Sequence, residues 1–152
     1  MDISRDYKDL FRTLNAHKVK YLVIGAYAVT FYTEPRFTKD LDVWASNDPV
    51  NAERLHRALV AFGAPLKSIS VEDLTDKKII YQIGIAPIRI DIMMGLSGLI
   101  FDRAWKNRKR TRYDRVPINV LGLRELIYSK KRTGREQDIL DLKKLTNKKY
   151  FK

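Results

Sequence analysis

The feature that most constrains the fold of this chain is a short apolar run that leads directly into a different pattern. Tyr21–Ile24 is apolar throughout, and the run stops at Gly25. The next residues, 26–32, read AYAVTFY. We interpret this change as a buried strand that turns sharply into a helix. The sequence therefore predicts a sheet with at least one helix packed on it.

Strand and helix patterns alternate along the rest of the sequence. Four more segments are predicted as strands, the second and third as an antiparallel pair: Asp40–Ala45, 78–84, 87–93 and 117–123. Four amphipathic helices are predicted: one through Tyr7 and Leu14, one from Pro49 to Gly63, one through Leu123 and Ile127, and one from Arg135 to about Leu145. The basic segment 101–115 is only weakly periodic. This order predicts an α/β (α+β) fold with helices covering one sheet, in a single domain over 1–152. Its core spans about 1–100, and a basic strand and helical tail span about 101–152.

The composition excludes several classes of protein. The chain has no cysteine, which excludes disulfides, thiolate-bound zinc and cysteine nucleophiles. His17 and His56 are too few for a histidine-rich metal site. No apolar run reaches the roughly 18 residues of a membrane-spanning helix, and the first residues lack the apolar segment of a signal peptide. We therefore expect a cytoplasmic protein that does not enter a membrane.

The positive charge is concentrated in the last third of the chain. The formal net charge is +12, and residues 101–152 hold 17 basic and 6 acidic residues. This asymmetry favours a polyanionic partner, with nucleic acid first and an acidic membrane surface second. The basic residues Arg108, Lys109, Arg110 and Arg112 lie near Trp105 and Tyr113, a combination that suits a nucleic-acid backbone and a stacked base. A solvated basic surface is the alternative.

Three aspartates occupy the polar faces of two predicted strands. Asp40 and Asp42 are two residues apart, so they project from one face with α-carbons about 6.6 Å apart. Asp91 lies on the strand 87–93, opposite its isoleucines. If the two strands are neighbours in register, the three carboxylates form an oxygen-rich site suited to Mg²⁺ or Mn²⁺ and to two-metal phosphoryl chemistry. The alternatives are a solvated polar face, or neutralisation by Arg89.

Small residues follow the first predicted strand. Gly25 and Ala26 stand where that strand becomes a helix, and a turn of this kind allows backbone N–H groups and the helix N-terminus to approach a phosphate. An ordinary tight turn would use the same residues. The turn precedes the acid pair by about 15 residues.

Taken in order, these motifs resemble those of the nucleotidyltransferase superfamily typified by DNA polymerase beta, and especially its small prokaryotic members. The matching segments are Tyr21–Ala26, Arg36–Val43 and Arg89–Asp91, with a C-terminal part that includes Tyr128, Ser129, Lys130, Asp138 and Asp141. The resemblance implies a mixed-sheet core in which Asp40, Asp42 and Asp91 hold the metal ions and carry catalysis, with Asp91 also suited to act as base. It implies that Gly25 and Ala26 bind the nucleotide phosphates, although this family generally has Gly or Ser where Ala26 stands. Arg36 and Thr38 would contribute to nucleotide binding.

The resemblance implies a reaction and a set of partners. The expected activity is transfer of a nucleoside monophosphate from an NTP such as ATP to an acceptor hydroxyl, with Mg²⁺ or Mn²⁺ as cofactor. The acceptor is predicted to be tRNA or another RNA, and the size and layout resemble toxins of bacterial toxin–antitoxin systems, which would add an antitoxin partner. The alternatives are nucleotidylation of a protein with an acidic surface, and a degenerate fold that only binds nucleic acid or protein. The charged residues of the tail are interpreted more readily as helix-surface charge or packing than as site residues.

Overall fold

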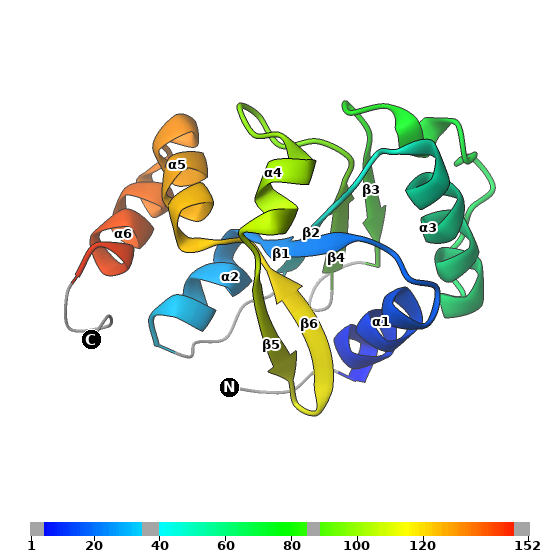
Figure 1. The fold of residues 1–152 in the computed structure, drawn as a ribbon, viewed down its shortest axis with the longest axis horizontal. Helices are drawn as coiled ribbons and strands as arrows, with labels where there is room; N and C mark the ends of the chain where they lie inside the picture. The colour runs from blue at the N-terminus through cyan, green and yellow to red at the C-terminus, as the bar shows by residue number, and fades with distance from the viewer. Residues whose placement is uncertain (1–4, 35–39, 85–88, 148–152) are drawn as a thin grey trace.

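The central element of the structure is one mixed sheet of six strands. The computed structural model describes residues 5–34, 40–84 and 89–147, and their strands lie in the order β3-β4-β2-β1-β6-β5 (Figure 1). The strands are β1 (Tyr21–Ile24), β2 (Asp40–Ala45), β3 (Ile80–Ile83), β4 (Arg89–Met93), β5 (Lys109–Tyr113) and β6 (Val116–Val120). The pairs β1–β6 and β2–β4 are parallel, and the other neighbours are antiparallel. The predicted mixed α+β sheet is confirmed.

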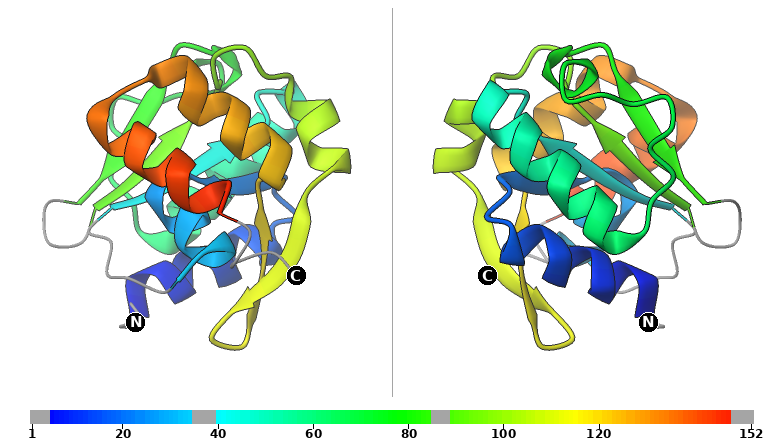
Figure 2. Two further views of the ribbon diagram at one scale, coloured as in Figure 1. Left: turned by 90° about the vertical axis from the view of Figure 1, so that its left-hand side faces the viewer. Right: turned by 90° about the vertical axis from the view of Figure 1, so that its right-hand side faces the viewer.

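Helices flank this sheet on both sides. They are α1 (Arg5–Ala16), α2 (Gly25–Tyr32), α3 (Pro49–Phe62), α4 (Phe101–Lys106), α5 (Leu123–Thr133) and α6 (Glu136–Leu145), with a 3₁₀ turn, η1 (Asp73–Thr75). Figure 2 shows α5 and α6 together on one flank and α1 with α3 on the opposite flank. No helix in the described ranges has both the length and the apolar character needed to cross a bilayer.

Apolar and acidic side chains alternate along the first part of β2, so the two faces of the sheet differ in character. Leu41 and Val43 are fully buried, and on the face they share Phe11 of α1 stacks on Tyr21 with ring centroids 6.0 Å apart. Asp40 and Asp42 project from the opposite face because side chains alternate along a strand. One face of the sheet is therefore closed by an apolar core, and the other retains charged side chains.

Helix α3 shows how local sequence fixes an element in place. The carboxylate of Asp48 accepts hydrogen bonds from the N–H groups of Val50 and Asn51, and Gly63 ends the helix in the left-handed conformation. The buried Asn51 side chain also donates to the carbonyls of Lys20 and Ser46. These bonds join α3 to the segments beside β1 and β2, and the predicted helix is confirmed.

The segment 101–115 forms the short helix α4 and the edge strand β5. Both elements are only five or six residues long, which explains why no clear periodicity marks them. The guanidinium of Arg108 lies 3.8 Å from the centre of the Trp105 ring and bonds to Asn119. Contacts between side chains thus fix the junction between α4 and β5, and the periodicity of the sequence does not reveal such contacts.

Candidate active site

Two of the three predicted acids lie side by side. In the parallel pairing of β2 with β4, Asp42 is opposite Asp91 and Asp40 is opposite Arg89. Neighbouring strands are about 4.8 Å apart, so the carboxylates of Asp42 and Asp91 project from adjacent positions on one face. Asp91 is buried, with 7% of its surface exposed, and Asp42 is half-buried. We call Asp40, Asp42 and Asp91 the acid row.

The carboxylate of Asp91 is engaged by two side chains of the same sheet. Arg89 donates from Nε to Oδ1 at 3.2 Å and from Nη2 to Oδ2 at 3.1 Å, and Gln82 of β3 donates to Oδ1 at 3.3 Å. The pairing with Arg89 is one of the alternatives open from the sequence. It neutralises one negative charge of the acid row and occupies both oxygens of Asp91.

The surroundings of Asp42 alter its acidity. Burial, followed by the negative charges of Asp91 and Asp40, raises its pKa to about 6, while Lys130 and Arg89 act in the opposite direction. A carboxylate with this pKa is destabilised in its charged form. The acid row therefore favours the approach of a positive charge.

Gly25 lies against the acid row at the start of α2. Its φ angle is +68°, and a Cβ at this position would overlap Oδ2 of Asp42. The preceding residue, Ile24, is opposite Asp42 in the antiparallel pair and supplies no side-chain cap to α2. The first N–H groups of this helix therefore begin beside the acid row, where an anion can accept hydrogen bonds from them.

Lys130 brings a buried positive charge from α5. Its Nζ atom lies 3.0 Å from Oδ1 of Asp138 and 3.2 Å from Oδ2 of Asp141, both on α6. Burial alone would raise the pKa of Asp138, but hydrogen bonds from Thr133, Arg135 and Lys130 hold it well below its usual range. Of the two interpretations from the sequence, helix-surface charge is wrong for Lys130, Asp138 and Asp141, which are all buried, and packing fits them.

The sequence does contain a signal for this buried cluster. Lys130 follows Leu126 by four residues, and Asp138 and Asp141 precede Leu145 by seven and four residues. These are the spacings of a single helix face, and both leucines are buried. The charged residues thus occupy core positions of their helices, which the amphipathic pattern alone would have assigned to apolar side chains.

Tyr7 of α1 is a neighbour of the acid row that sequence reasoning placed only in the core. Its hydroxyl donates to the backbone carbonyl of Arg89 at 3.4 Å. Burial, with the charges of Asp40, Tyr113 and Asp42, raises the pKa of Tyr7 to about 12. Tyr7 is therefore protonated at neutral pH.

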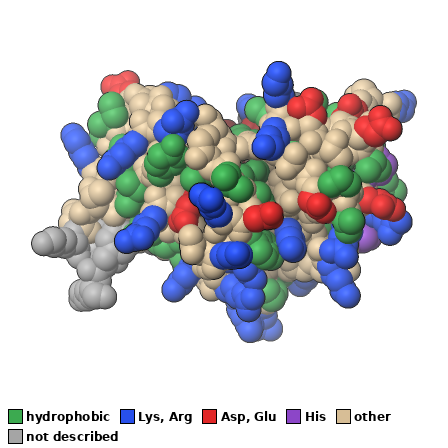
Figure 3. Space-filling model, turned by 45° about the horizontal axis from the view of Figure 1, so that its top comes forward, with side chains coloured by type: hydrophobic (Ala, Val, Ile, Leu, Met, Phe, Trp, Pro, Cys, Tyr) green, Lys and Arg blue, Asp and Glu red, His purple; other side chains and the backbone are tan. Residues whose placement is uncertain are grey.

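The other predicted site residues lie elsewhere. Arg36 and Thr38 are outside the described residues. Lys109, Arg110 and Arg112 are exposed on β5, three strands from β2 and thus about 14 Å from it along the sheet. In Figure 3, Lys and Arg side chains gather at the lower edge of the molecule, where Figure 1 places β5 and β6. The basic strand and the acid row are therefore separate surfaces.

The donor chemistry of the acid row suits a hard divalent cation. All the donors are carboxylate oxygens, and burial together with their mutual repulsion raises the pKa of Asp42. Within residues 5–34, 40–84 and 89–147, no three acidic or histidine side chains are arranged to hold a metal ion as they stand. The Arg89–Asp91 ion pair directs both oxygens of Asp91 to the guanidinium. The residues fit a metal ion once that pair opens.

The structure thus has the mixed sheet, the glycine turn into a helix and the carboxylates in register on two parallel strands that the resemblance to polymerase beta-like nucleotidyltransferases implies. The chain belongs to the family described as nucleotidyl transferase of unknown function (DUF2204), which matches residues 3–151. It is an enzyme of the nucleotidyltransferase class. No curated protein matches its sequence.

Solved structures share the fold at low sequence identity. The lincosamide antibiotic adenylyltransferase LnuA, in a lincomycin-bound structure, has a TM-score of 0.62 and 15% identity, covering 97% of this chain and 99% of its own. The antibiotic-resistance factor ANT(2'')-Ia has a TM-score of 0.64 and 8% identity, covering 92% and 80%. TM1012 of Thermotoga maritima, described as a candidate nucleotidyltransferase, has a TM-score of 0.59 and 20% identity, covering 94% of both chains.

Proposed function

We propose that this enzyme transfers a nucleoside monophosphate from an NTP to an acceptor hydroxyl and requires Mg²⁺ or Mn²⁺. The single observation that carries the proposal is the register of Asp42 with Asp91 on parallel strands, beside the glycine turn at Gly25. In the reaction, the acceptor oxygen forms a bond to the α-phosphorus while the bond from that phosphorus to the pyrophosphate oxygen breaks. Pyrophosphate leaves, and the proton of the acceptor hydroxyl moves to a carboxylate.

Each part of the site has a role in this proposal. Asp40, Asp42 and Asp91 would hold the metal ions, which supply charge for the developing oxyanions. The N–H groups that follow Gly25 receive the phosphates, and the glycine conformation keeps the first turn of α2 against Asp42. Asp91 is placed to accept the proton once Arg89 has released it. Arg36 and Thr38 remain proposed nucleotide contacts.

RNA is one candidate acceptor, and the exposed cations of β5 favour it. Lys109, Arg110 and Arg112 line the outer edge of the sheet, where a phosphate backbone can follow them. An acidic protein, including an antitoxin, would meet the same charges. The lincosamide acceptor of LnuA gives no argument here, because a likeness at 15% identity concerns the fold.

Transfer from labelled nucleotide tests the proposal. The protein is incubated with each α-³²P-labelled NTP, Mg²⁺ or Mn²⁺, and either total RNA or total small molecules from a cell extract. Asp42→Asn is expected to abolish labelling by keeping the shape but removing the charge, while Glu72→Gln, an exposed acid outside the site, is expected to leave it unchanged. Equal labelling by wild type and Asp42→Asn would refute the assignment. Labelling of no acceptor would favour the degenerate binding module.

A further inference from the structure

A cavity of about 610 Å³ continues the acid row along the same face of the sheet. Asp42, Trp44 and Ser46 alternate in the sequence, so Trp44 lies about 6.6 Å beyond Asp42 on the same face. Trp44 and Ser46 both line the cavity, and Trp44 is opposite Met93 in the pairing of β2 with β4. The cavity therefore begins one step along β2 from the proposed reaction centre.

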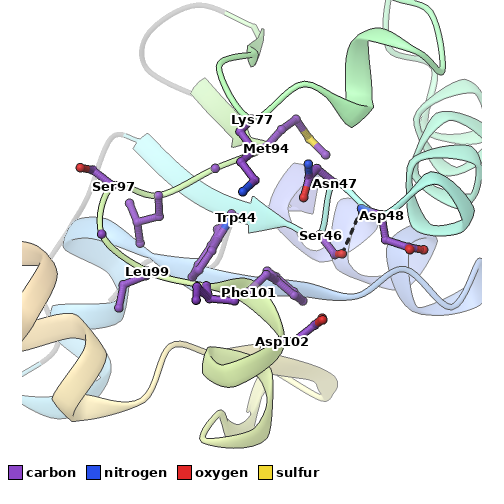
Figure 4. Close-up of a pocket in the computed structure, with 14 residues that line it drawn as sticks. Trp44, Ser46, Asn47, Asp48, Lys77, Met94, Ser97, Leu99, Phe101 and Asp102 are labelled. Atoms are coloured by element: carbon purple, nitrogen blue, oxygen red, sulfur yellow. Dashed lines mark hydrogen bonds between the residues drawn. The ribbon is translucent and has the colours of Figure 1, made fainter.

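The size and walls of this cavity suit a small molecule. Pockets for small ligands commonly measure about 300–1,000 Å³ and combine an apolar lining with a few polar groups. The rings of Trp44 and Phe101 meet edge to face at 5.1 Å, and Met94, Leu96 and Leu99 complete the apolar part. Figure 4 shows Trp44 and Phe101 facing the loop that carries Ser97 and Leu99.

The loop 95–100 that forms one wall is attached to α5. Arg132 donates from Nη2 to Oγ of Ser97 at 3.2 Å. Gly98 has a φ angle of +79°, and a Cβ there would meet the side chains of Arg132 and Tyr128 within 3 Å. The wall is thus joined to α5, the helix that also carries Lys130.

The charges of the cavity are unevenly placed. Asp48 and Asp102 lie on the side of Ser46, Lys77 lies above Trp44, and Ser97 and Leu99 lie at the opposite end (Figure 4). One oxygen of Asp48 caps α3, whereas the side chain of Asp102 has no ion pair or hydrogen bond with any described residue. Lys20 and Arg54 line an adjoining hollow on the other side of these carboxylates, and they form no ion pair with them within the described ranges. The end at Asp102 therefore favours an ammonium group.

We propose that this cavity binds the acceptor, and that the acceptor is a small molecule with a hydroxyl group, an apolar ring and an amine. The ring lies against the partly exposed Leu96 and Leu99, beside the buried edge-to-face pair of Trp44 and Phe101, the amine lies near Asp102, and the hydroxyl extends along β2 toward Asp42 and Asp91. This inference rests on the proposed transfer reaction and names its substrate class.

Intrinsic fluorescence tests the cavity without relying on catalysis. Trp44 and Trp105 are the two tryptophans, so Trp105→Phe leaves Trp44 as the sole reporter. Three probes share a phenyl ring and a hydroxyl and differ in charge: 2-amino-1-phenylethanol, 1-phenylethanol and mandelate. We expect the amine to bind about threefold to fivefold more tightly than the neutral alcohol, the effect of one exposed ion pair, and mandelate to bind most weakly.

Variants assign the effect to Asp102. Asp102→Asn is expected to remove the preference for the amine while retaining binding of the neutral alcohol, and Glu72→Gln is expected to leave all three affinities unchanged. Binding of none of the probes, or mandelate binding as tightly as the amine, would overturn the proposal. A separate assay with labelled ATP distinguishes failure of the proposed reaction from failure of the cavity assignment. Binding of the amine without transfer to any acceptor refutes the proposed reaction alone. Transfer to RNA with no probe bound refutes the cavity assignment alone.

Discussion

Both carboxylate oxygens of Asp91 accept hydrogen bonds from the guanidinium of Arg89, at 3.2 Å and 3.1 Å. The two residues are neighbours on one face of β4, with Ile90 between them buried on the other. Arg89 thus neutralises part of the acid row and competes with any cation that would bind Asp91.

Replacement of Arg89 is expected to transfer this role to a metal ion. In EDTA, Arg89→Gln should lower the melting temperature because Asp42 and Asp91 then repel each other without compensation. Mg²⁺ should raise the melting temperature of the variant more than that of the wild type. Differential scanning fluorimetry provides the measurement, and Arg57→Gln, which breaks an exposed pair with Glu53, is the control. An equal Mg²⁺ effect in all three proteins would contradict the competition.

Asp42 is expected to reduce the stability of the metal-free protein at neutral pH. Its pKa rises from 3.8 to about 6 on folding, so the folded state favours the protonated form. The penalty is absent below about pH 4, develops as the pH rises and is complete above about pH 6. Asp42→Asn should therefore stabilise the protein by about 1–3 kcal/mol at pH 8 in EDTA, and by little at pH 4. Urea unfolding at the two pH values checks this, and a variant less stable than wild type at pH 8 would contradict it.

Gly25→Ala is expected to combine two penalties. The φ angle of +68° disfavours any Cβ, and the added methyl group would overlap Asp42. Gly63→Ala is a matched control because its φ angle is +91° and nothing lies within 4 Å of the added Cβ. We expect Gly63→Ala to lower the free energy of unfolding by about 1 kcal/mol and Gly25→Ala to lower it by at least about 2 kcal/mol. Only Gly25→Ala is expected to lose transfer activity. Equal costs for the two variants would show that Asp42 can move aside.

Lys130→Met is expected to destabilise the protein by about 3 kcal/mol. The change leaves Asp138 and Asp141 buried without their shared counter-charge. The triple variant with Asp138→Asn and Asp141→Asn should recover part of this loss, because no buried charge of the cluster remains. Urea unfolding at pH 7 measures both, with Lys143→Met on the last turn of α6 as the control. No recovery in the triple variant would point to packing rather than charge.

If RNA binds along β5, its affinity should depend on salt. Arg110→Gln with Arg112→Gln should reduce the slope of log affinity against log salt by about 2, one for each phosphate that the variant no longer neutralises. Fluorescence anisotropy of a labelled tRNA between about 50 and 200 mM salt measures the slope. Arg57→Gln with Lys67→Gln removes the same charge from another surface. If both pairs of substitutions change the slope equally, binding is non-specific.

More of the fold than of the candidate site could be predicted from the sequence. Apolar periodicity and capping residues located the core strands and α3, because these patterns are local consequences of burial, as in Asp48 and Gly63. The neighbouring positions of Asp42 and Asp91 depended on a parallel pairing that no local pattern specifies. The ion pair of Arg89 with Asp91 was one of several alternatives that the sequence left open. The buried ion pairs of Lys130 with Asp138 and Asp141 depend on how α5 packs against α6, which the sequence does not specify. The cavity beside Trp44 was absent from the sequence reasoning because a distant loop closes it.

Helix α5 has a consequence for the order of events at the site. Lys130 and Arg132 are two residues apart. The ammonium of Lys130 acts on the charge of Asp42, and the guanidinium of Arg132 donates a hydrogen bond to Ser97. A displacement of the α5 backbone would move both residues together. A ligand that displaced α5 from the loop 95–100 would therefore also shift a charge that acts on Asp42, and this helix would couple the binding of acceptor and nucleotide.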